Sequence, residues 1–114
     1  MTEGIKTIVY PVSDLAKAKS LYSSFLQVEP YMDEPYFVGF NTDGPSVGLD
    51  PHGAAKNMTG PVVFWNVPDI KASVQTLLDA GAELVQEVKD VGGGAITAMV
   101  RDADGNVTGF IQSA

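Results

Sequence analysis

The sequence predicts a single α+β domain built from two tandem β-α-β-β-β modules. Its 114 residues, with 45% hydrophobic and 18% charged side chains, have the size and composition of one folded domain. The chain also contains an internal repeat, and strand-like and helix-like segments follow in the same order in each copy. We expect modules at about residues 4–51 and 60–113, joined by a linker at 51–59 within one domain spanning 1–114.

The repeat is degenerate, but its spacing is regular. Residues 8–15 (IVYPVSDL) match residues 63–70 (VFWNVPDI) at a constant offset of 55. Residues 43–49 match residues 104–110 at an offset of 61. A longer loop around residues 91–94 would absorb the difference between the two offsets. The chain therefore consists of two copies of one module.

In the first module, β-branched and aromatic residues predict a strand over 5–12. A helix follows, capped by Asp14, with apolar residues at helical spacing at Leu15, Ala18, Tyr22, Phe25 and Leu26. Further strands are predicted at 36–41 and 46–50, joined by a turn at residues 43–44. The acidic stretch that contains Glu29, Asp33 and Glu34 is predicted to be a solvated loop.

The second module follows the same plan. A first strand around 63–67 leads to a helix capped by Asp69, with an apolar stripe of Ile70, Val74, Leu77 and Leu78 and with Gly81 just past its end. Short strands are predicted at 84–88, 95–101 and 107–111. The glycine run at 92–94 is predicted to be a flexible loop, because no Lys-Ser/Thr follows it and the next segment is a strand.

Composition excludes several classes of function. The chain has 7 basic and 14 acidic residues, so its net charge is 7 − 14 = −7, and it has one histidine and no cysteine. Thiol chemistry, cysteine-based zinc sites and sites that need two histidines are excluded. The negative charge opposes binding to nucleic acids and anionic lipids. No signal peptide and no long apolar segment is present, so a cytoplasmic protein without membrane partners is expected.

The motif Asp-x-Asp-Gly-Asn at 102–106, together with residues 12–15 leading to Leu21-Tyr22 and Leu26, resembles the vicinal oxygen chelate superfamily. This group includes glyoxalase I, bleomycin-resistance proteins, fosfomycin-resistance proteins and extradiol dioxygenases. The resemblance implies the glyoxalase/bleomycin-resistance fold, in which the two modules form a curled mixed sheet with a central cleft. A second subunit often completes this cleft, so a homodimer is expected.

In the enzymes of that superfamily the cleft holds a divalent metal bound by His, Gln or Glu on the first and last strands of the modules. The resemblance places these positions on Thr7 and Val62, and on Gly48 and Gly109. These residues lack the imidazole and carboxylate donors of a catalytic metal site. Asp50 shares the face of Gly48, but one carboxylate and one hydroxyl fall short of three ligands. We expect no metal and no other cofactor.

Strand alternation indicates what would line the cleft instead. The expected ligand-binding residues are Thr7, Val9, Gly48, Asp50, Val62, Phe64, Asn66, Gly109 and Ile111. These are mostly apolar with a few polar groups, which is typical of a small-molecule site. The two glycines are expected to leave room for a flat or bulky ligand. Trp65 is expected in the core, and which face of residues 36–40 lines the cleft stays open.

The leading hypothesis is metal-independent binding or sequestration of an apolar or aromatic small molecule in the inter-module cleft. The alternative is a lyase, isomerase or dioxygenase of the same superfamily with an atypical site, and Asp50 is the candidate for its base. A third possibility is an accessory subunit that acts through its dimer surface. His52 is expected in the connector and not in catalysis, and Asp102 and Asp104 are expected to stabilise their turn.

Overall fold

A computed structural model of the chain describes residues 2–114. The chain divides into two compact units, which are described separately below. One contains Thr7–Pro61, and the other contains Val62–Ala114 together with the start of the chain up to Lys6. We call them the first and second modules. The connector at 51–59 lies in the first module, and the opening residues up to Lys6 lie in the second.

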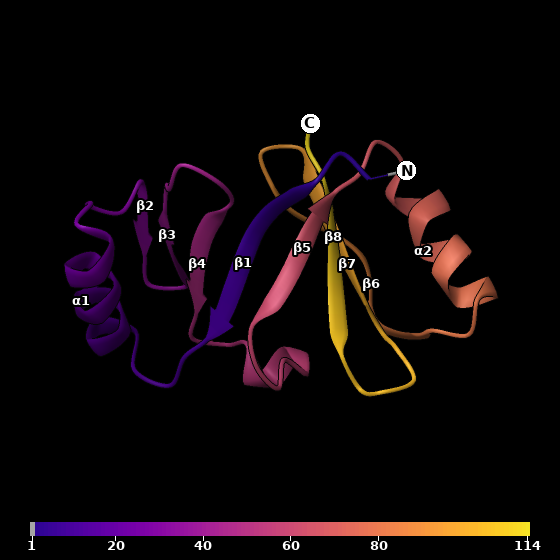
Figure 1. The fold of residues 1–114 in the computed structure, drawn as a ribbon, viewed down its shortest axis with the longest axis horizontal. Helices are drawn as coiled ribbons and strands as arrows, with labels where there is room; N and C mark the ends of the chain where they lie inside the picture. The colour runs from indigo at the N-terminus through magenta and orange to yellow at the C-terminus, as the bar shows by residue number, and fades with distance from the viewer. Residues whose placement is uncertain (1) are drawn as a thin grey trace. The chain divides into compact units, whose positions relative to one another are not determined.

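The first module contains β1 from Thr7 onward, followed by α1, β2, β3 and β4 (Figure 1). Their bounds are Ile5–Pro11, Leu15–Leu26, Met32–Glu34, Phe37–Phe40 and Ser46–Asp50, and a short 3-10 helix at Ala54–Lys56 follows. The strands lie in the order β2-β3-β4-β1. β1 and β4 are parallel, whereas the other neighbours are antiparallel.

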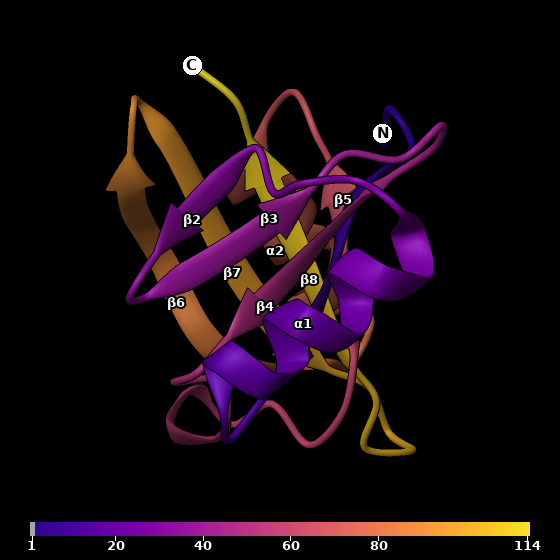
Figure 2. The ribbon, with the colours of Figure 1, turned by 90° about the vertical axis from the view of Figure 1, so that its left-hand side faces the viewer.

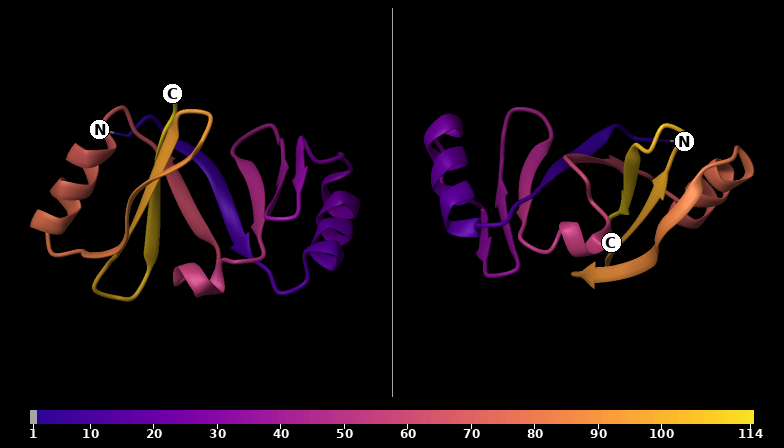
Figure 3. Two further views of the ribbon diagram at one scale, coloured as in Figure 1. Left: turned by 180° about the vertical axis from the view of Figure 1, so that it is seen from behind. Right: turned by 90° about the horizontal axis from the view of Figure 1, so that it is seen from below.

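The second module has the same sequence of elements, β5, α2, β6, β7 and β8 (Figure 3). Their bounds are Val62–Asn66, Ile70–Asp79, Glu83–Gly92, Ala95–Arg101 and Val107–Gln112. The strand order is β5-β8-β7-β6, again with one parallel pair, β5 and β8. The predicted α+β class with two β-α-β-β-β modules is therefore confirmed.

Both predicted helix caps are confirmed. The Asp14 carboxylate accepts a hydrogen bond from the backbone N–H of Lys17, and the Asp69 carboxylate accepts one from the N–H of Ala72, each at 3.1 Å. These bonds satisfy N–H groups that a helix N-terminus leaves without an intrahelical partner. Gly81 follows α2 with a φ of +107°, a conformation that glycine adopts without steric cost.

Each helix packs against one face of the sheet in its own module. α1 lies across the face of β3 and β4 (Figure 2). Its core contains Val38, Phe40 and Leu49 with Tyr10 and Tyr22 packed against them, and burial raises the pKa of Tyr22. This answers the open question about residues 36–40, because Val38 and Phe40 face the helix and Phe37 and Gly39 face the opposite side.

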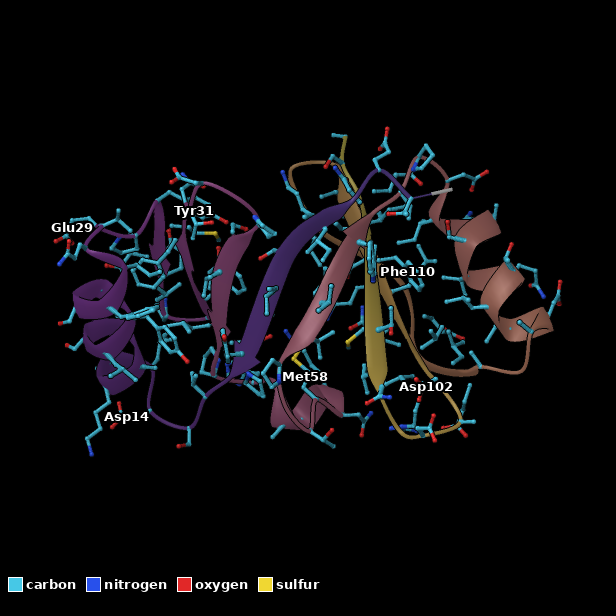
Figure 4. The ribbon with its side chains drawn as sticks, viewed as in Figure 1. Asp14, Glu29, Tyr31, Met58, Asp102 and Phe110 are labelled. Carbon is cyan, nitrogen blue, oxygen red and sulfur yellow. The ribbon has the colours of Figure 1, made fainter. Side chains whose placement is uncertain are left out.

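The core of the second module follows the predicted alternation. Val67, Ile70, Val74 and Phe110 are buried against one another, and Trp65 packs against this cluster. Phe110 lies on β8 (Figure 4). The prediction that Trp65 belongs to the core is confirmed.

Three local predictions were wrong. Residues 32–34 form β2 instead of a loop, because their backbone pairs with β3, and Asp33 forms an ion pair with Lys19 of α1. Phe25 does not belong to the packed stripe of α1, since 78% of its surface is exposed. The glycine run is a tight hairpin, in which Gly93 and Gly94 have φ values of +62° and +81° as a type I′ turn requires.

Within residues 2–114, neither helix has the length and apolar character needed to cross a membrane.

Candidate functional site

The predicted site residues lie on the face of each sheet opposite its helix, which we call the helix-free face. In the first module these are Thr7, Val9, Gly48 and Asp50. The register sets Val9 beside Gly48 and Gly48 beside Gly39, so these three residues form a row across β1, β4 and β3. Gly39 was not among the predicted site residues, because the facing of its strand could not be read from the sequence.

Aromatic rings cover both glycines of this row. A Cβ atom placed on Gly48 would lie 2.3 Å from Cζ of Phe37, and one placed on Gly39 would lie 2.7 Å from the ring of Tyr31. Such distances are impossible for a real Cβ, so the rings occupy the space that side chains at these positions would fill. Tyr31, labelled in Figure 4, and Phe37 therefore belong to the helix-free face of the first module.

In the second module, the predicted residues Val62, Phe64, Asn66, Gly109 and Ile111 share the helix-free face, because their strand neighbours Trp65 and Phe110 face the helix. The register adds two residues that the prediction missed. Met99 pairs with Gly109, and Thr97 pairs with Ile111. Alternation along 95–101 could have identified them, since Ala98 and Val100 belong to the core.

Gly109 is covered in the same manner as Gly48. A Cβ placed on Gly109 would lie 2.5 Å from Cδ1 and 2.8 Å from Cγ of Phe64, its direct neighbour on β5. The expectation that both glycines leave room for a ligand was therefore wrong. The sequence shows that both positions lack a side chain. It does not show that the phenyl rings of Phe37 and Phe64 fill the space above them.

Few polar groups lie on these faces. The Thr7 hydroxyl donates a hydrogen bond of 3.0 Å to the carbonyl of Ser46, and the Gln86 amide donates one of 3.1 Å to the Thr97 hydroxyl. The backbone of Asn66 bonds to Glu3 and Gly4. Its half-buried side-chain amide has no hydrogen-bond partner among residues 2–114, so it can bond to a ligand.

Asp50, the candidate base, is 3% exposed, and both of its carboxylate oxygens are engaged. Oδ1 accepts a hydrogen bond of 2.8 Å from the N–H of His52, and Oδ2 accepts one of 2.7 Å from Lys56 Nζ. The Asp50 carbonyl also accepts bonds from the N–H groups of Val12 and Gly53. These contacts fix the start of the connector to β4.

The connector itself packs tightly onto the first module. A Cβ on Gly53 would lie 2.5 Å from Cβ of Pro11 and 3.1 Å from the sulfur of Met58. Met58 is buried, and its backbone N–H bonds to the Gly53 carbonyl (Figure 4). His52, between Pro51 and Gly53 in this connector, is exposed.

The residues at the superfamily's metal positions do not fit a divalent ion. The Thr7 hydroxyl donates a hydrogen bond to Ser46, and Val62 is buried and apolar. Phenyl rings of neighbouring strands lie over Gly48 and Gly109. Within the part of the chain that the structure describes, no three His, Cys, Asp or Glu side chains cluster as metal ligands would. No catalytic step through a metal follows from this donor set.

The Asp102 turn is a self-contained hydrogen-bonded unit. Oδ1 of Asp102 accepts bonds of 2.9 Å from the N–H groups of Asp104 and Asn106, and Oδ2 accepts one of 3.0 Å from the Asn106 amide. The bond from the Asn106 side chain is the main cause that holds the pKa of Asp102 below its usual range, and the backbone bonds act in the same direction. The carboxylate stabilises the loop between β7 and β8 (Figure 4).

Comparison with known proteins gives a family match over nearly the whole chain. Residues 4–110 match the model of the glyoxalase/bleomycin resistance protein/dioxygenase superfamily. A superfamily member from Vibrio splendidus 12B01 superposes with a TM-score of 0.72 at 23% identity, covering 96% of this chain and 99% of that one. No curated protein sequence matches the chain.

Other solved structures share the fold under different names. A protein described as NAD-dependent benzaldehyde dehydrogenase from Legionella pneumophila superposes with a TM-score of 0.77 at 18% identity, covering 95% of this chain and 98% of that one. Methylmalonyl-CoA epimerase from Mycobacterium tuberculosis gives 0.69 at 17% identity, covering 99% and 89%. The fold is shared, and function has to be argued from the site.

Proposed function

The chain belongs to the glyoxalase/bleomycin resistance protein/dioxygenase superfamily, and from this premise we propose that it binds an apolar or aromatic small molecule without a metal ion. One observation carries the proposal. At the positions where the superfamily's enzymes hold metal ligands, this chain has two glycines covered by phenyl rings, a buried valine, and a threonine whose hydroxyl donates a hydrogen bond to the backbone. The donors of a catalytic site are replaced by apolar surface.

The composition of the helix-free faces supports a binding role. In the second module Val62, Phe64 and Met99 are buried apolar side chains, and Asn66 of the same face adds an amide that has no described partner. An apolar surface with a few polar anchors is the usual lining of a small-molecule site, because apolar contacts supply affinity and polar groups fix orientation.

The competing function is an enzyme that uses Asp50 as a base. It is less well supported, because both carboxylate oxygens already accept hydrogen bonds and the side chain is buried against the connector. The Asp50→Asn variant separates the two functions, since it keeps an oxygen for the His52 N–H but cannot act as a base. A binder should retain most of its affinity for a neutral ligand, whereas an enzyme should lose turnover.

Native mass spectrometry of the full chain, purified without added metal, tests the proposal. We expect extra mass from a small organic molecule and none from a metal ion. Stoichiometric binding of Zn²⁺, Ni²⁺ or Mn²⁺ at micromolar concentration, together with lyase or isomerase activity, would overturn it. The same spectrum tests the homodimer that we propose from the superfamily resemblance.

A further inference from the structure

Two aromatic rings lie next to each other on the helix-free face of the first module. The ring of Tyr31 lies over Gly39, and the ring of Phe37 lies over Gly48. The two glycines are direct partners in the β3–β4 register. Directly opposed residues of antiparallel strands have Cα atoms about 4.5–5.5 Å apart. The two rings are therefore close enough for a fused two-ring molecule to contact both.

The rings differ from core aromatics in their exposure. Tyr31 is 55% exposed although its ring rests on the sheet, and Phe37 is half-buried. In contrast, Phe40 on the helix face of the same strand is fully buried. Exposed aromatic surface that gathers in one place is typical of binding sites. Glycines beneath the rings let them approach the backbone and leave their outer surface available.

A carboxylate lies beside these rings. Glu34 pairs with Phe37 in the β2–β3 register, so both side chains project from the helix-free face. Its neighbour Asp33 projects from the other face, where it pairs with Lys19 of α1. Among residues 2–114, no cation forms an ion pair with Glu34, and its side chain is exposed.

The charge of this surface selects the class of ligand. Aromatic rings carry negative electrostatic potential on their faces and attract cations. The Glu34 carboxylate adds to this attraction, and the chain's net charge of −7 favours the approach of cations and opposes that of anions.

We propose that Tyr31, Phe37 and Glu34 form a subsite for a planar aromatic cation on the helix-free face of the first module. The subsite rests on the proposed binding function and specifies its ligand class. The rings supply stacking and cation–π contacts, and Glu34 neutralises the positive charge of the ligand. Aromatic rings over glycines also stabilise sheets, so the test has to separate recognition from stability.

Three probes of similar size make that separation. 1-Methylquinolinium is a planar cation, 2-naphthoate is a planar anion, and N,N-dimethyldecahydroquinolinium is a saturated cation. Each is titrated into the full ¹⁵N-labelled chain and followed by NMR. We expect 1-methylquinolinium to bind at least about tenfold more tightly than either of the others, with ring-current shifts at the amides of Gly39 and Gly48.

Variants assign the contacts. Tyr31→Leu and Phe37→Leu should each weaken binding of 1-methylquinolinium about 3- to 30-fold, whereas Tyr31→Phe should retain most of the affinity. Glu34→Gln should weaken it and reduce its dependence on salt. Glu29→Gln is the matched control, because Glu29 is an exposed carboxylate beside the end of α1 (Figure 4). Unchanged dispersion of the spectra shows that each variant is folded.

The subsite is overturned if 2-naphthoate or the saturated cation binds equally well, if no probe binds, or if the shifts map only to the second module. It is also overturned if the folded Tyr31→Leu variant keeps full affinity. These outcomes are distinct from failure of the proposed function. A neutral or anionic molecule that co-purifies in native mass spectrometry would support binding and reject this subsite, whereas a metal-dependent activity would reject the binding function itself.

Discussion

Among single residues, Asp50 illustrates how burial limits the chemistry of a carboxylate. Its oxygens hold the connector through His52 and Lys56, so the energy of its hydrogen bonds stabilises the fold. Asp102 also accepts several hydrogen bonds, but it is exposed to solvent. The two residues should therefore respond differently to substitution and to pH.

Replacing Asp50 with alanine should lower the free energy of unfolding by about 2 kcal/mol, because the partly buried N–H of His52 and the partly exposed ammonium group of Lys56 lose their acceptor. Urea unfolding measures the change. Asp90→Ala is the control, since the Asp90 carboxylate also accepts a bond from a backbone N–H two residues later but is exposed. Its effect should stay below about 1 kcal/mol. Equal effects of the two substitutions would contradict a structural role for Asp50.

The stability that Asp102 supplies should depend on pH in a defined direction. Its pKa is lowered in the folded chain, so the contribution is present above the ordinary aspartate pKa and is lost as the pH falls from about 4 through the lowered value. Asp102→Asn keeps an acceptor oxygen but has no charge to titrate. Thermal unfolding of both proteins at several pH values should show their difference shrinking below pH 4. A difference that grows with acidity would contradict the assignment.

Among the secondary-structure elements, the glycines that lie under aromatic rings affect the contact between paired strands. Gly48 pairs with Gly39, and Gly109 lies between Phe64 and Met99 in the strand registers. The ring that covers Gly48 and the ring that covers Gly109 each come from a neighbouring strand. A substitution at either glycine therefore changes the contact between two strands as well as the helix-free face.

Gly109→Ala should destabilise the protein more than Gly48→Ala. At Gly109 the new methyl group would meet Cγ and Cδ1 of Phe64, near the base of the ring, whereas at Gly48 it would meet the far end of Phe37, which can swing away. We expect a loss of about 1–3 kcal/mol for Gly109→Ala, as for other overpacked sites. Chemical denaturation measures both variants. Gly60→Ala serves as the control, since its Cβ would enter open space.

For the whole molecule, membership of the superfamily raises the question of a metal ion. The donor set at the family's ligand positions does not fit one, and fold similarity extends to structures described as a dehydrogenase and as an epimerase. Fold alone therefore does not select the activity.

Treatment with a chelator should leave the melting temperature unchanged. A metal ion present at one hundred times its dissociation constant would add about 2.7 kcal/mol to the free energy of unfolding. For a chain of this size that amounts to roughly 10 °C. Differential scanning calorimetry before and after dialysis against EDTA checks this, with reloading by Zn²⁺ as the control. A drop in melting temperature that Zn²⁺ restores would show that the chain uses a metal.

The sequence by itself determined the repeat, the order of elements, both helix caps and the assignment of Trp65 to the core. These properties follow from local spacing and alternation, which a single chain displays directly. The composition also excluded thiol chemistry and sites that need two histidines.

Tertiary structure alone decided what fills the helix-free faces. Residues 32–34 became a strand only because β3 offered a partner, and Phe37 and Phe64 cover glycines that neighbour them across strands and not along the chain. Asp50 is engaged by Lys56, a side chain six residues away in a folded connector. Contacts of this kind depend on register and on side-chain direction in three dimensions, and no local pattern in the sequence specifies them.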